Sequence, residues 1–127
     1  MAVNDAFFDD SVLDGALDIL AACTDLYLVP AGTSPGDTEA TVDAAALAPS
    51  VAPSFTGPAA GTPSGRELEI DTKDFAVDAN GTAAAFALTD GSNVLYVQEL
   101  NATQGVTSGQ TWTLPAVTIT FPDYDAA

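Results

Sequence analysis

The stretch FALTDGSNVLYVQEL, residues 86–100, contains two apolar runs separated by a turn signal. The first run ends at Asp90-Gly91. Asp-Gly between apolar segments is a strong hairpin signal, because glycine adopts positive φ at no steric cost. The sequence therefore predicts an antiparallel hairpin that joins a strand over 82–89 to a strand over 94–100.

The same alternation of apolar and polar residues continues on both sides of this hairpin. Leu68 and Ile70 alternate with acidic residues, and a closing strand over 117–121 alternates apolar residues with threonine. A short apolar run over 26–29, stopped by a proline, predicts one earlier strand. The expected fold is mainly β: a small antiparallel β-sandwich or barrel, with 66–127 as its antiparallel core and 1–127 as a single domain.

One segment near the start has helical rather than β periodicity. The residues DDSVLDGALDILAAC, 9–23, predict an amphipathic helix that Asp9 or Asp10 caps, and this helix with the first strand makes up 1–29. Its apolar stripe follows the i, i+3, i+4, i+7 spacing and is widened by three further apolar residues: Leu13, Ala16, Leu17 and Leu20, then Val12, Ile19 and Cys23.

Residues 30–65 form a long passage rich in proline and glycine. A structureless loop of that length is unusual inside a compact domain unless it is functional or orders on a partner. We expect an extended arm or lid, with a mobile surface loop as the alternative. A short helical turn is possible over 41–47, and Val51 and Phe55 are candidates to anchor the arm to the body.

The charge of the chain is strongly negative. Eighteen acidic residues face two basic ones, Arg66 and Lys73, which gives a formal net charge of −16 at pH 7. Self-repulsion of this size is relieved by salt, so the composition suits a saline, marine or halophilic setting. Two cations cannot supply the phosphate contacts of nucleic-acid binding, and the same reasoning disfavours an anionic membrane surface.

The residue types of familiar catalytic sites are missing from the sequence. It has no histidine, one cysteine (Cys23, expected as a buried thiol) and no glycine-rich nucleotide motif. We expect neither an enzyme nor a bound cofactor. The sequence also has no secretory leader pattern and no apolar run long enough to span a membrane, so neither secretion by a cleaved signal nor a membrane span is expected.

Two sets of residues remain as candidates for binding. Asp71, Asp74 and Asp78 cluster near a predicted turn, but the glutamate that closes an Asp-rich calcium loop is absent, so a solvated acidic face is preferred to a metal site. The candidates for an interface with other proteins are large apolar residues: Phe7, Phe8, Val51, Phe55 and Trp112. Trp112, on a predicted strand, is expected in the core, with an interface anchor as the alternative.

The run AAAFALTDGSNVLYVQELNATQGVTSGQTWTLPAVTITFPD, residues 83–123, resembles a pattern in small structural proteins of tailed bacteriophages. The opening DAFFDDSVLDGALDIL is similar to the amphipathic start of those proteins. The resemblance covers the helix and the last third of the chain, and it does not extend to 30–65.

This resemblance implies a virion structural protein of the head-decoration, or cement, kind. Such a protein lies on the outer surface of the capsid and binds the major capsid protein and copies of itself, with a trimer as the preferred arrangement by analogy. The alternatives are a head spike, a tail or head–tail connector subunit, and a β module that binds a glycan or a cation.

Overall fold

The computed structural model describes residues 9–60 and 65–121. Within them the chain is mainly β, with a helix near its start, as the sequence predicts. The elements in chain order are α1 (Asp10–Ala21), β1 (Asp25–Val29), α2 (Glu39–Ala45), β2 (Phe55–Ala60), β3 (Arg66–Ile70), β4 (Lys73–Ala76), β5 (Gly81–Thr89), β6 (Val94–Val106), β7 (Thr111–Leu114) and β8 (Val117–Phe121).

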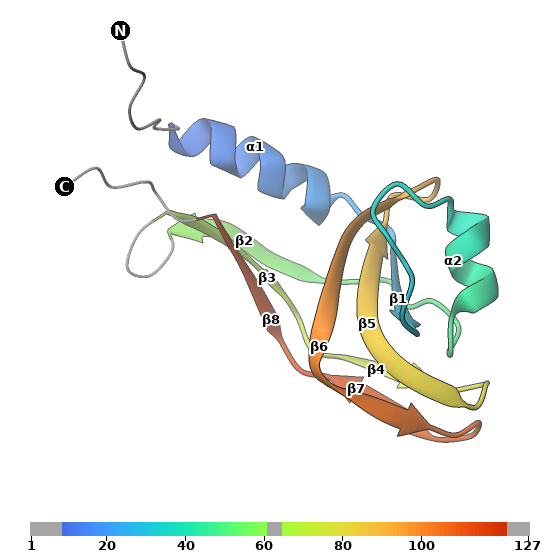
Figure 1. Ribbon diagram of the computed structural model, residues 1–127. Helices are drawn as coiled ribbons and strands as arrows, with labels where there is room; N and C mark the ends of the chain where they lie inside the picture. The colour runs from blue at the N-terminus through green and yellow to red at the C-terminus, as the bar shows by residue number, and fades with distance from the viewer. Residues whose placement is uncertain (1–8, 61–64, 122–127) are drawn as a thin grey trace, which may run out of the picture.

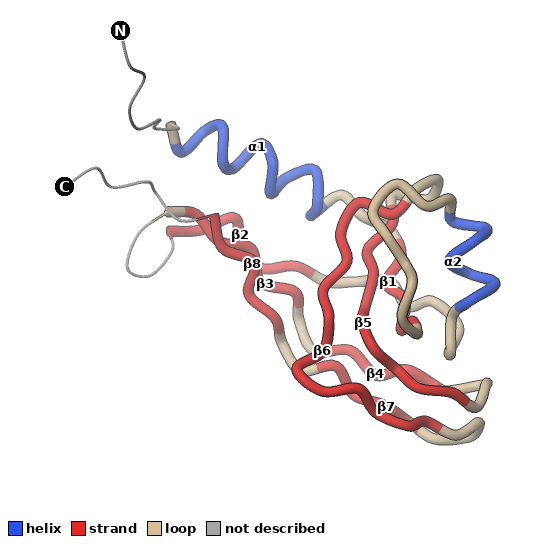
Figure 2. Tube along the Cα trace, viewed as in Figure 1, coloured by secondary structure: helices blue, strands red, loops and turns tan. Residues whose placement is uncertain are grey.

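The strands form three small antiparallel sheets, consistent with a small sandwich. Their orders are β1–β5–β6, β2–β3–β8 and β4–β7. The long strands β5 and β6 curve strongly along their length, and the β2–β3–β8 sheet extends away from the part that carries α2 (Figure 1). Helix α1 lies along β2 and β3, whereas α2 covers β1 (Figure 2).

The predicted hairpin is present as β5 and β6. Its turn is held by the Asp90 carboxylate, which accepts backbone hydrogen bonds from Ser92 and Asn93, both at 2.9 Å, while Gly91 supplies a φ of +95°. These hydrogen bonds, first that from Asn93 and then that from Ser92, hold the pKa of Asp90 below its ordinary value. Strand β6 is longer than predicted and continues past residue 100 to Val106.

The main core fills the space between the sheets and under α1. It draws buried side chains from nearly every element, among them Leu17, Leu28, Leu68, Phe75 and Phe86. The rings of Phe75 and Trp112 lie 6.2 Å apart in this core.

A second, smaller cluster lies on the other face of the β1–β5–β6 sheet. There Val42 of α2 packs with Tyr27, Val29, Ala85 and Ala87. Strand β5 is therefore buried on both faces over 85–89, which explains why it carries a nearly continuous run of apolar residues instead of a strict alternation. Alanine at the α2-facing positions allows the helix to approach the sheet closely.

The structure does not show the extended arm predicted over 30–65. The described part of that segment carries α2 and β2 and is hydrogen-bonded to the body. The Thr38 side chain caps α2, Val51 exchanges backbone hydrogen bonds of 2.8 and 3.0 Å with Leu26, and β2 pairs with β3. Leu26 and β3 supply backbone hydrogen-bond partners that the composition of the segment alone does not reveal.

Candidate interaction surface

One face of α1 presents apolar side chains to solvent. Val12 is 55% exposed and Ile19 is 62% exposed, and within the described residues these are the two large hydrophobic side chains that are exposed. Gly15 and Ala16 lie between them and are also exposed. We call Val12, Gly15, Ala16 and Ile19 the α1 stripe; their i, i+3, i+4, i+7 spacing places them on one side of the helix.

The α1 stripe is part of a wider apolar face that the body only partly covers. Leu17 is fully buried and Leu20 nearly so, while Leu13 is half-buried. A Cβ built on Gly15 would meet no atom within 4 Å, so none of the described elements packs on that side. The sequence predicts the full width of this face, and the structure shows that the body covers only half of it.

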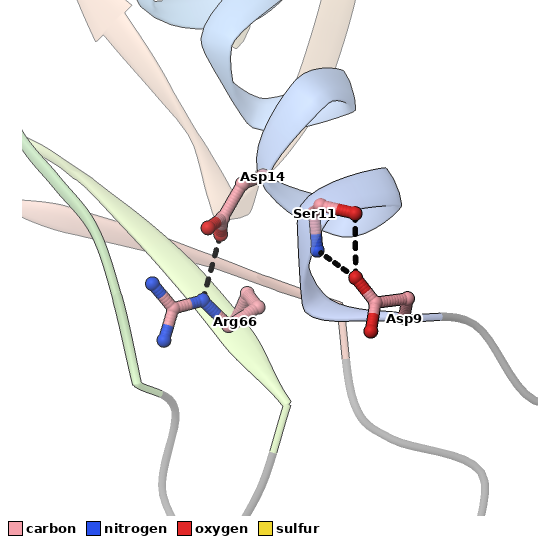
Figure 3. A network of polar contacts seen from close by, with 4 residues as sticks. All are labelled: Asp9, Ser11, Asp14 and Arg66. Carbon is pink, nitrogen blue, oxygen red and sulfur yellow. Dashed lines mark hydrogen bonds and ion pairs between the residues drawn. The ribbon is translucent and has the colours of Figure 1, made fainter.

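Two polar contacts fix where α1 begins and how it lies on the sheet (Figure 3). The Asp9 carboxylate caps the helix by accepting from the Ser11 backbone N–H at 3.0 Å and from its hydroxyl at 2.5 Å. Arg66 Nε of β3 donates to the Asp14 carboxylate at 2.7 Å. The cap agrees with the prediction that Asp9 or Asp10 starts the helix, and the ion pair orients α1 with the stripe away from β3.

The predicted interface residues do not form one surface. Phe7 and Phe8 lie outside the described residues. Val51 and Phe55 are half-buried and pack against the main core. Trp112 is only 8% exposed and its indole N–H donates to Gln104 Oε1 at 2.6 Å, so it is largely a core residue.

The three acidic metal candidates are engaged separately. Asp71 accepts from the Thr56 hydroxyl at 3.1 Å, and Asp74 accepts from the Thr113 hydroxyl at 2.6 Å. Asp78 is exposed and its backbone N–H donates to the Leu47 carbonyl at 3.0 Å. Over 9–60 and 65–121, no group of three or more His, Cys, Asp or Glu residues is arranged to hold a metal ion.

A half-buried carboxylate that the sequence did not single out joins α2 to the sheet. Glu39 accepts hydrogen bonds from the Tyr27 hydroxyl and the Thr89 hydroxyl, both at 2.7 Å. Burial opposes ionisation of Glu39, but these hydrogen bonds outweigh it and hold its pKa below the ordinary value. Burial, and then the bond to Glu39, raises the pKa of Tyr27. The arrangement is structural, because each partner is already engaged.

The single thiol is placed where reactivity is low. Cys23 is buried at the end of α1, and burial, with a contribution from Asp90, raises its pKa to about 11. A thiol is nucleophilic as the thiolate, so little of Cys23 is reactive at neutral pH.

Comparison of the chain with protein-family models, curated proteins and solved structures finds no match. In the part of the chain that the structure describes, neither helix has the length and hydropathy needed to cross a membrane.

Proposed function

We propose that this protein is a structural subunit of a tailed-phage virion, which decorates the outside of the head by binding the major capsid protein through the α1 stripe. The observation that carries the proposal is the exposure of Val12 and Ile19 on one face of a helix whose adjoining face, with Leu17 and Leu20, is buried. Hydrophobic side chains scattered singly need no explanation, but two on one helix face form the centre of a contact.

The charge of the chain indicates what surrounds that contact. With a formal net charge of −16, a second copy placed against α1 would be repelled, whereas a partner with a basic rim would be attracted. The proposed partner surface is therefore a hydrophobic groove bordered by lysine or arginine. The trimer expected by analogy with cement proteins stays a prediction. Its subunit contacts are not attributed to the α1 stripe, which is proposed to contact the capsid protein.

Copy number in purified particles tests the proposal. Virions of the phage that encodes this chain are purified by density gradient, and this protein and the capsid protein are quantified by mass spectrometry. A decoration subunit is expected at a copy number of the same order as the capsid protein. Absence from the particles would overturn the proposal. A copy number per particle that is enough for only one ring of subunits would favour a connector or tail subunit instead.

A further inference from the structure

A pocket of about 290 Å³ opens between β6 and the segment where β7 leads into β8. Its size is at the lower end of the range of small-molecule sites. The lining combines an apolar floor with a polar rim of amides and one carboxylate. The floor includes Phe86, Trp112, Leu114 and Val117, and the rim includes Gln98, Glu99, Asn101 and Gln104.

An irregularity in β6 creates the rim. Ala83 pairs with Gln104 and Ala85 pairs with Glu99, so four residues of β6 stand opposite the single residue Ala84. Such bulges break the ladder and redirect side chains. Three of the extra residues, Leu100, Asn101 and Ala102, line the pocket, and Asn101 is exposed.

Two aromatic side chains hydrogen-bond to two rim amides, and one of them fixes the orientation of its partner. Trp112 Nε1 donates to Gln104 Oε1 at 2.6 Å, and the Tyr96 hydroxyl donates to Gln98 Oε1 at 2.7 Å. Since an indole N–H is only a donor, the atom that faces Trp112 must be the amide oxygen. The NH₂ groups of both glutamines remain as donors, and among the described residues neither has a hydrogen-bond acceptor.

The charge of the lining restricts the ligand. The described lining residues include one carboxylate, Glu99, and no cation, and the whole chain is strongly acidic. A phosphate or carboxylate ligand would therefore be repelled. The matching ligand is neutral, has oxygen acceptors for the two amide donors, and has an apolar face for the floor.

We infer that this pocket binds a neutral saccharide ring. The inference does not rest on the proposed capsid role, because it concerns the protein alone in solution. A single sugar ring bound in a shallow pocket is expected to have a dissociation constant in the millimolar range.

The chain contains a single tryptophan, so its fluorescence reports on the pocket directly. The full chain is titrated with D-glucose, D-galactose, D-mannose and N-acetyl-D-glucosamine, and saturation-transfer NMR checks contact with the sugar. At least one neutral sugar is expected to give a saturable response below roughly 200 mM. D-Glucuronate, the anionic counterpart of glucose, is expected to bind about tenfold more weakly than the best neutral sugar.

Three isosteric variants locate the binding. Gln104→Glu and Gln98→Glu keep the acceptor oxygen for Trp112 and Tyr96 but remove the NH₂ donors. Gln110→Glu adds the same charge outside the lining, where the side-chain oxygen accepts from the Thr107 backbone N–H at 3.0 Å. The two pocket variants are expected to weaken binding about three- to tenfold each, and the control by less than about twofold.

Several results would overturn the inference: no saturable response to any of the four neutral sugars, glucuronate binding as tightly as the best of them, wild-type affinity in both pocket variants, or equal weakening by Gln110→Glu. Circular dichroism checks that each variant is folded, and if Gln104→Glu fails this check, Gln98→Glu still tests the rim. Capsid binding is not measured in this assay, so its outcome leaves the proposed function unaffected.

Discussion

At the scale of single residues, Gly57 shows how closely the β2–β3 pair is fitted. Its φ is +107°, and a Cβ built on it would lie 3.0 Å from the Glu67 carbonyl oxygen and 3.1 Å from the Ala59 nitrogen. Both neighbours are backbone atoms, which cannot move aside without disturbing the strand pairing. The position therefore disfavours a side chain for two independent reasons, its positive φ and the close backbone atoms.

Gly57→Ala is expected to lower the free energy of unfolding by about 2–4 kcal/mol, as the sum of the positive-φ cost and the backbone clash. Gly32→Ala is the matched control, because Gly32 has the same φ of +107° and a Cβ there would meet nothing within 4 Å. The control is expected to lose about 1–2 kcal/mol in urea unfolding. Equal losses in the two variants would contradict the close approach at Gly57.

Glu39 gives the protein a pH-dependent contribution to stability. Its pKa is lowered in the folded state, so the contribution is present above the ordinary value of 4.5 and is lost as the pH falls through the lowered pKa. Glu39→Gln is expected to cost about 1 kcal/mol at pH 7, and the difference from the wild type should shrink below about pH 4.

Urea unfolding at pH 7, 5, 4 and 3 measures this difference. In a Tyr27→Phe background, which removes one donor to Glu39, the cost of Glu39→Gln at pH 7 should be smaller. A cost that stays constant across the pH series, or one that Tyr27→Phe does not reduce, would show that the carboxylate is not stabilised in this way.

At the scale of elements, α1 separates residues that hold the fold from residues available to a partner. The Val12→Ser/Ile19→Ser double variant is expected to change the free energy of unfolding by less than about 0.5 kcal/mol, because both side chains are exposed. Leu17→Ala removes a fully buried side chain from the adjoining face of the same helix and is expected to lower the free energy of unfolding by about 2–5 kcal/mol. Thermal and urea unfolding would contradict the assignment of the faces if the double variant were as destabilised as Leu17→Ala.

The elements that the sequence predicted are those whose signal is local. The Asp90-Gly91 turn, the alternation in β3 and β8, and the period and cap of α1 each follow from neighbouring residues. Strand β2 pairs with the next strand, β3, and α2 packs on β1, but the proline- and glycine-rich segment 30–65 lacks the alternation that predicts a strand. Its sequence indicated only a helical turn over 41–47 and the anchors Val51 and Phe55.

The candidate surface was only partly predictable for a related reason. The sequence shows the width of the apolar face of α1, but the orientation of the helix on β3, fixed in part by Arg66 and Asp14, decides which half stays exposed. The amides around Trp112 were not predicted either, because the irregularity in β6 that brings them together has no local sequence signal.

At the scale of the whole molecule, the net charge of −16 is expected to destabilise the folded state at low ionic strength. The melting temperature is expected to rise as sodium chloride increases from about 10 mM to 1 M, because screening shortens the range of the repulsion. A Glu67→Gln/Glu69→Gln variant, which removes two of the eighteen acidic residues, should melt higher than the wild type at low salt and show a smaller difference at high salt. A melting temperature that is flat across the series would contradict this reading of the charge.

The most direct measurement of the central claim is binding of the pure protein to capsids that lack it. Capsids of the phage that encodes the chain are sedimented with the wild type, with Val12→Ser/Ile19→Ser, and with Thr118→Ser/Thr120→Ser as a control on the exposed positions of β8. The wild type and the control are expected to co-sediment saturably and equally, and the stripe variant to bind about tenfold or more weakly, because two apolar side chains no longer enter the contact. Wild-type protein that stays in the supernatant, or a stripe variant that binds like the wild type, would contradict the account.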